Sequence, residues 1–203
     1  MRRLRRKPTI ATAVLAVIAV AVWQFTPLQA IVALSSLSDP AKLATLGERG
    51  ANARLNKIVF WLDVARQRGM SAESAVGWAQ TINETNEPRA SLVKNQLARN
   101  LKIADELGLL TTDNRDRLKR GSAAIVARGP YSGETVEIDH IVPSSLAPEV
   151  GNELANLEML PKSLNRQKSN RVNERQLAHA EKLFEAGLLR KESLDQVRRQ
   201  AEK

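Results

Sequence analysis

The sequence predicts an α+β fold that is mostly helical, for three reasons. Aromatic residues make up 3% of the chain, so the core is built mainly from Leu, Ile, Val and Ala, a composition that favours helices. Residues 35–121 contain no β-rich run. The two short runs that do suggest strands, VEIDHIVP and NLEML, come later, and the first alternates with the period of a strand. A helical region is therefore expected first, and a small strand-containing module after it.

The chain starts with a segment, residues 1–34, that has the build of a signal peptide or a membrane anchor. Five positive charges lie within the first seven residues, and an apolar run spans residues 10–23. A charged stretch followed by such a run is typical of export signals. Because positive charge stays on the cytoplasmic side, the rest of the chain is expected to be exported: periplasmic or otherwise extracytoplasmic, secreted or anchored by this single segment.

The sequence leaves the fate of this segment open. The small-residue cleavage sites at 28–30 and 31–33 are imperfect matches. Residues 8–34 are long enough for membrane attachment, since a spanning helix needs about 20 residues. A buried core helix is the third alternative.

Composition excludes several kinds of chemistry. The chain has no cysteine, so it has no disulfides, no thiolate zinc site, no thiol catalysis and no lipoprotein anchor. The net charge is +9, but five of the positive charges belong to the N-terminal segment. The remainder is mildly basic, which is compatible with a polyanionic partner.

Residues 35–120 are expected to form three or four packed helices without chemistry of their own. Apolar residues recur there at helical spacing between signals that start helices. The start signals are Asp39 with Pro40, Ser71 and Pro88. Residues 176–203 are expected to form a further helical tail.

Residues 121–175 hold the side chains that suggest chemistry. Gly and Pro turns deliver the chain into VEIDHIVP, a polar loop follows, NLEML gives a second strand, and Pro161 can begin a helix. A carboxylate, Asp139, and an amide, Asn165, would supply the hard oxygen ligands that suit Mg²⁺ or Mn²⁺. His140 is the side chain suited to activate water near neutral pH.

A cationic run surrounds these residues, and cations of this kind bind phosphates. It comprises Lys162, Arg166, Lys168, Arg171 and Arg175. Two other residues are interpreted without a role in the chemistry: Glu137 as a solvent-facing strand residue and His179 as a surface residue of an amphipathic helix.

Three blocks in order, DHIVP, LANLEMLP and LNRQKSN, resemble the His-Asn-His (HNH) nuclease family in its ββα-metal form. The variant with asparagine at the third position, as in the HNH domain of CRISPR effector nucleases, is the closer match. The resemblance covers residues 121–175 and implies a ββα-metal module that follows the helical region.

The resemblance also implies roles for individual residues. His140 would be the general base, and Asp139 and Asn165 would ligate one divalent metal. Asn156 would complete the catalytic set by holding the long loop so that His140 is correctly presented. Asn152 competes for that position, although Asn156 followed by leucine fits the pattern better.

The same resemblance implies an endonuclease that leaves 3′-hydroxyl and 5′-phosphate ends. Its substrate would be DNA rather than RNA, because most of the family cuts DNA, and Arg166, Lys168 and Arg171 would contact the nucleic acid. The family's flanking zinc-binding cysteine pairs are missing. Asparagine at position 165 favours Mg²⁺ as the cofactor, with Mn²⁺ as the alternative. No protein partner is identifiable.

Two rival interpretations remain at this point. One is a catalytically inactive HNH-like module that binds nucleic acid while tethered at the membrane. The other is a helical interaction protein of the cell envelope in which the motif is coincidental. Chelator-sensitive cleavage would exclude both.

Overall fold

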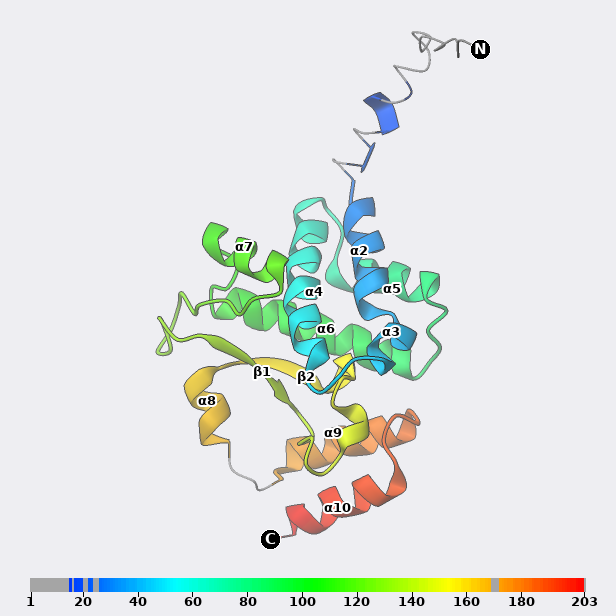
Figure 1. Ribbon diagram of the computed structural model, residues 1–203, viewed down its shortest axis with the longest axis vertical. Helices are drawn as coiled ribbons and strands as arrows, with labels where there is room; N and C mark the ends of the chain where they lie inside the picture. Colours follow the sequence, from blue (N-terminus) through cyan, green and yellow to red (C-terminus); the bar gives the residue numbers. More distant parts are fainter. Residues whose placement is uncertain (1–14, 16, 20–21, 24–25, 169–171, 203) are drawn as a thin grey trace, which may run out of the picture.

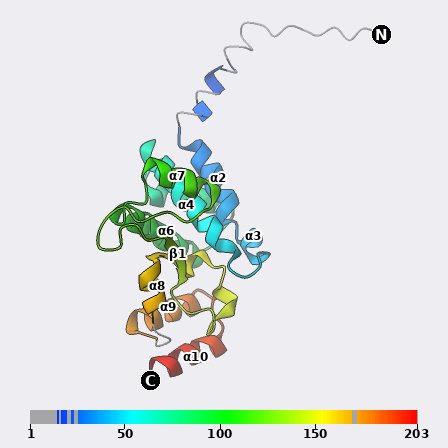
Figure 2. The ribbon, with the colours of Figure 1, turned by 60° about the vertical axis from the view of Figure 1, so that its left-hand side comes forward.

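The computed structural model describes residues 15, 17–19, 22–23, 26–168 and 172–202. It confirms a mostly helical α+β fold with one small antiparallel sheet (Figure 1). Along the long axis a helical bundle comes first, the sheet lies below it, and two C-terminal helices follow. The view turned by 60° shows the same order (Figure 2).

Amphipathic helices, whose apolar faces meet in one core, form the bundle. They are α2 (Leu28–Ser38), α4 (Gly50–Gln67), α5 (Ala72–Ile82), α6 (Arg89–Glu106) and α7 (Thr112–Arg120), with the short α3 (Pro40–Ala44) beside them. Two of the expected N-caps are present, since Asp39 accepts from the Ala41 amide and Ser71 accepts from the Ser74 amide. Pro88 stands at the N-cap of α6, which begins at Arg89, as expected.

The expected boundary at residue 34 falls inside α2. Ala30 and Leu34 are buried where this helix packs on α4 and α5, so residues 28–34 belong to the bundle. Apolar residues at this spacing can pack in a protein core or lie in a membrane. The sequence alone could not distinguish the two, so residues 28–34 were expected to belong to the N-terminal segment. Most of that segment, including residues 1–14, lies outside the described residues. Within the described residues, no helix is long and apolar enough to cross a membrane.

The sheet consists of β1 (Val136–His140) and β2 (Leu157–Pro161), paired antiparallel with Asp139 opposite Glu158 and His140 opposite Leu157. The fully buried Asn100 of α6 forms hydrogen bonds with backbone groups on the outer edge of β2. Its side chain donates to the Leu157 carbonyl at 2.9 Å and accepts from the Met159 amide at 3.0 Å. This amide pair imitates a neighbouring strand and fixes the sheet on the bundle.

Helix α8 (Lys162–Gln167) follows β2 directly and contacts both strands, which completes the order strand, loop, strand, helix. The loop between the strands carries two single 3₁₀ turns, η1 (Pro148–Val150) and η2 (Leu154–Asn156). Helices α9 (Glu174–Glu185) and α10 (Lys191–Ala201) pack on each other at the C-terminal end.

Candidate functional site

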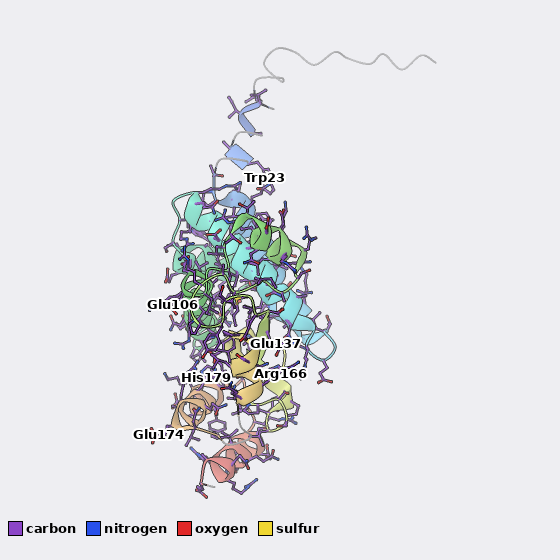
Figure 3. All side chains as sticks on the ribbon, turned by 90° about the vertical axis from the view of Figure 1, so that its left-hand side faces the viewer. Trp23, Glu106, Glu137, Arg166, Glu174 and His179 are labelled. Carbon is purple, nitrogen blue, oxygen red and sulfur yellow. The ribbon has the colours of Figure 1, made fainter. Side chains whose placement is uncertain are left out.

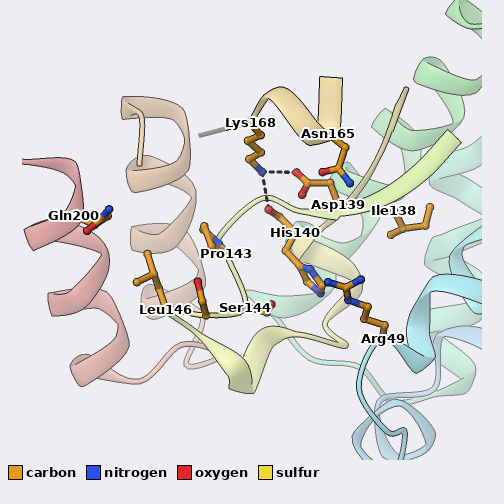
Figure 4. Close-up of a pocket in the computed structure, with 11 residues that line it drawn as sticks. Arg49, Ile138, Asp139, His140, Pro143, Ser144, Leu146, Asn165, Lys168 and Gln200 are labelled. Carbon is orange, nitrogen blue, oxygen red and sulfur yellow. Dashed lines mark hydrogen bonds and ion pairs between the residues drawn. The ribbon is translucent and has the colours of Figure 1, made fainter. Parts of the chain in front are cut away.

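A pocket of about 540 Å³ opens at the C-terminal end of β1. It is lined by Arg49, Ile138, Asp139, His140, Pro143, Ser144, Ser145, Leu146, Asn165, Lys168 and Gln200 (Figure 4). Four of the residues that the motif singles out, Asp139, His140, Asn165 and Lys168, therefore share one cavity. They come from β1, from α8 and from the residue after α8.

His140 is held by the long loop. It is 9% exposed, and its Nε2 lies 2.8 Å from the carbonyl oxygen of Gly151. A carbonyl can only accept, so Nε2 must carry the proton of the neutral ring. The lone pair is then on Nδ1, which makes no hydrogen bond within the described part of the chain. The geometry thus selects the tautomer in which Nδ1 can take a proton from water.

Asn156 fixes the conformation of that loop. The residue is fully buried, and its Oδ1 accepts from the Val142 amide at 2.8 Å. Its Nδ2 donates to the carbonyls of Val142 at 3.0 Å and of Val150 at 3.3 Å. One side chain therefore joins the residues just after β1 to the turn just before Gly151. These bonds support the expected loop-holding role of Asn156, which stays a prediction.

The competing residue, Asn152, has a different set of contacts. Its Nδ2 donates to the carbonyls of Leu46 and Gly47, and its Oδ1 accepts from the Ala51 amide at 3.0 Å. Asn152 therefore ties the loop to the start of α4, whereas Asn156 organises the loop itself.

Among the described residues, Asp139 and Asn165 each have one close partner. The Lys168 ammonium contacts the Asp139 carboxylate and also donates to the His140 carbonyl at 2.8 Å. Asn165 Nδ2 donates to Glu137 Oε2 at 2.8 Å. Glu137 is partly buried under α8 and is therefore not the solvent-facing residue that the sequence suggested. A carboxylate can only accept, so this bond turns the Asn165 amide with its NH₂ towards Glu137 and leaves Oδ1 without a partner within the described ranges.

These donors fit a hard divalent cation. The Asp139 carboxylate and the Asn165 amide oxygen border the same pocket, and carboxylate and amide oxygens with water are usual ligands of Mg²⁺. The contact between Asp139 and Lys168 shows that this carboxylate already holds a positive charge in place. Among the described residues no group of three His, Cys, Asp or Glu could hold a metal. A cation here would therefore depend on the amide and on water for its remaining ligands.

The other basic residues of the motif are arranged differently from one another. Arg166 is exposed on α8 (Figure 3). It does not line the pocket. Arg175 pairs with the buried Glu158 at 2.5 Å, and Arg171 lies outside the described residues. Among the described basic residues of the motif, Lys168 is the one that lines the pocket, where it contacts Asp139.

His179 on α9 is half-buried rather than at the surface. Its Nε2 lies 3.0 Å from the Ala155 carbonyl, and burial lowers its pKa. It does not line the pocket of His140. The chain therefore holds two histidines with the same kind of carbonyl partner, of which one faces the candidate site.

Two residues of the site were not identified from the sequence. Glu137 could have been suspected, because residues two apart on a strand share a face and Asp139 lies on the same face. Arg49 lies some ninety positions before the motif, and nothing local marks it as a pocket residue.

Comparisons of the chain with family models, with curated proteins and with solved structures found no match.

Proposed function

We propose that this protein is a divalent-metal-dependent endonuclease of the HNH type that hydrolyses phosphodiester bonds in nucleic acid, with DNA as the expected substrate. The observation that carries the proposal is the convergence of His140, Asp139 and Asn165 on one pocket from a strand, loop, strand and helix. The basic character of α8 and the charged, apolar N-terminus support an exported enzyme, secreted or anchored, that acts on a polyanion.

In this proposal His140 acts as the general base. The Gly151 carbonyl keeps the proton on Nε2, so Nδ1 accepts the proton of the attacking water. Asn156 keeps the loop, and with it Gly151, in position.

Asp139 and Asn165 would hold the divalent metal, most suitably Mg²⁺. When bound, this ion supplies positive charge next to the scissile phosphate and the leaving oxygen. Glu137 orients the Asn165 amide, and Lys168 exchanges its contact with Asp139 for a contact with phosphate. The phosphate-contacting roles of Arg166 and Arg171 remain predictions from the sequence.

The proposal is tested by incubating supercoiled plasmid with the purified full chain in Mg²⁺, in Mn²⁺ and in EDTA. Metal-dependent nicking or linearisation is expected. The ends are then examined by treating nicked plasmid with DNA ligase, which reseals a nick only if it carries a 3′-hydroxyl and a 5′-phosphate.

Intact plasmid in every metal, from folded protein, would contradict the proposal. If the same protein still retarded DNA on a gel, the rival interpretation of an inactive nucleic-acid-binding module would take its place.

A further inference from the structure

The helical bundle contributes one cation to the candidate site. Arg49 lies between α3 and α4, and its side chain extends from the opposite wall of the pocket towards His140 (Figure 4). A second cavity of about 340 Å³, which Asn165, Glu137 and Ile138 border from β1 and α8, is also lined by Arg49. The two cavities share Arg49, Ile138 and Asn165, so they adjoin, and Arg49 stands at their common border.

The segment that carries Arg49 is held in place by the loop between β1 and β2, which also holds His140. Asn152 makes three hydrogen bonds to Leu46, Gly47 and Ala51, which flank Arg49 on both sides. Asn152 follows Gly151, the residue whose carbonyl holds His140. The position of Arg49 is therefore coupled to the position of the proposed base through two adjacent loop residues.

The backbone at Arg49 is in a conformation that L-residues seldom adopt. Its φ is 56°, in the left-handed region. The next residue, Gly50, is packed so closely that a Cβ there would lie 2.8 Å from the Cβ of Leu46. Unfavourable backbone conformations of this kind persist where the surrounding structure enforces them, and they cluster at functional sites.

Within the described part of the chain, the guanidinium of Arg49 has one weak partner, an exposed glutamate. The side chain is 68% exposed, and its ion pair is with Glu48 at 4.0 Å, where the partner is 88% exposed. Such a surface pair contributes little. No hydrogen bond to this guanidinium forms within the described residues. Lys168, the other cation among the described residues that line the pocket, contacts Asp139.

We propose that Arg49 binds the backbone phosphate next to the scissile phosphate, so that the bundle and the ββα module contact the nucleic-acid strand from two sides. A guanidinium offers two parallel donors that match phosphate oxygens, which a lysine cannot do. This inference rests on the proposed function, because it assumes a nucleic-acid strand in the pocket.

The test measures DNA binding separately from cleavage. The full chain is titrated into a fluorescent DNA duplex in EDTA, and fluorescence anisotropy gives the dissociation constant. The titration is repeated at salt concentrations of about 50–200 mM, over which phosphate contacts become strongly screened. The main variant is Arg49→Gly, because glycine tolerates the left-handed backbone and the change removes the side chain alone. Arg49→Lys keeps the positive charge but removes the paired donors of the guanidinium. Arg128→Ala removes the same charge from an exposed arginine that lines neither cavity.

Arg49→Gly is expected to weaken binding about tenfold and to reduce the slope of log affinity against log salt by about 1, as for loss of one phosphate contact. Arg49→Lys is expected to retain the slope with intermediate affinity, and Arg128→Ala to resemble wild type. If wild type binds and cleaves DNA while Arg49→Gly behaves like Arg128→Ala, the inference on Arg49 is overturned and the proposed function stands. If wild type neither binds nor cleaves DNA, both fail.

Discussion

The role of Asn156 gives a prediction whose size follows from the structure. Replacing Asn156 with alanine removes three buried hydrogen bonds, two of them to Val142 and one to Val150. It also leaves the buried Val142 amide without its acceptor. The two bonds that Asn156 donates are worth about 1 kcal/mol each net, and the orphaned Val142 donor costs at least about 1 kcal/mol, so we expect Asn156→Ala to lower the free energy of unfolding by at least about 3 kcal/mol.

Nuclease activity should fall further than this loss of stability explains. A protein with a stability of about 5–15 kcal/mol stays folded at 25 °C after losing about 3 kcal/mol. The loop that presents His140 would nevertheless shift, and a misplacement of about 1 Å can cost roughly 100-fold in rate. We expect a loss of cleavage of about that size from folded protein.

Asn100→Ala is the matched control. Asn100 is also fully buried and also bridges backbone groups, but it lies at the outer edge of β2, away from the pocket. The Leu157 carbonyl keeps its bond from Gln96 at 2.9 Å. The loss is therefore the bond that Asn100 donates, about 1 kcal/mol, and the orphaned Met159 amide, at least about 1 kcal/mol, which together give at least about 2 kcal/mol. Cleavage should stay close to wild type.

Urea denaturation followed by circular dichroism measures both stabilities, and plasmid nicking in Mg²⁺ at 25 °C measures both activities. The reasoning is refuted if Asn156→Ala lowers stability by less than about 1 kcal/mol, the worth of a single bond, or if the two variants lose activity in equal measure.

Further predictions concern metal binding and acid stability. Glu137→Ala should weaken Mn²⁺ binding to the full chain by about 10–100-fold, because the Asn165 amide loses the acceptor that orients it. Glu137→Gln keeps an acceptor and should retain most of the affinity. Calorimetric titration measures both affinities. Equal affinities of wild type and Glu137→Ala would argue against this role. Burial raises the pKa of Glu149, but hydrogen bonds from Arg190 and Ser193 outweigh it and lower the pKa from 4.5 to about 2. Because the pKa of Glu149 is lower in the folded state than the ordinary value of 4.5, its ionised carboxylate stabilises the folded protein above pH 4.5. This stabilisation is lost as the pH falls towards 2. The melting temperature of wild type should therefore exceed that of Glu149→Gln at pH 6, with the difference shrinking between pH 4.5 and pH 2; a constant difference would contradict the assignment.

The parts of the fold that the sequence predicted are those set by local signals. The N-caps Asp39 and Ser71 and the strand β1 depend on a few neighbouring residues, so they could be identified without a structure. The same holds for the shared pocket of Asp139, His140 and Asn165, because a short strand, loop, strand and helix brings them together.

The parts that the sequence could not predict depend on contacts between distant segments. Residues 28–34 are apolar in either environment, and only packing against α4 and α5 places them in the core. Arg49 reaches the pocket because Asn152 holds its loop, a contact that spans about a hundred positions. Glu137 lies on the same face of β1 as Asp139, yet whether that face is solvated or covered is decided by α8.

The most direct test of the central claim compares the two histidines. His140→Gln and His179→Gln each retain a donor for the backbone carbonyl that the histidine contacts, Gly151 or Ala155, but glutamine cannot act as a base. The measurement is the rate of Mg²⁺-dependent plasmid nicking at saturating protein. The account predicts a loss of about 10²–10⁴-fold for His140→Gln, the usual contribution of a general base, and a rate near wild type for His179→Gln. Equal rates for folded His140→Gln and wild type would contradict it.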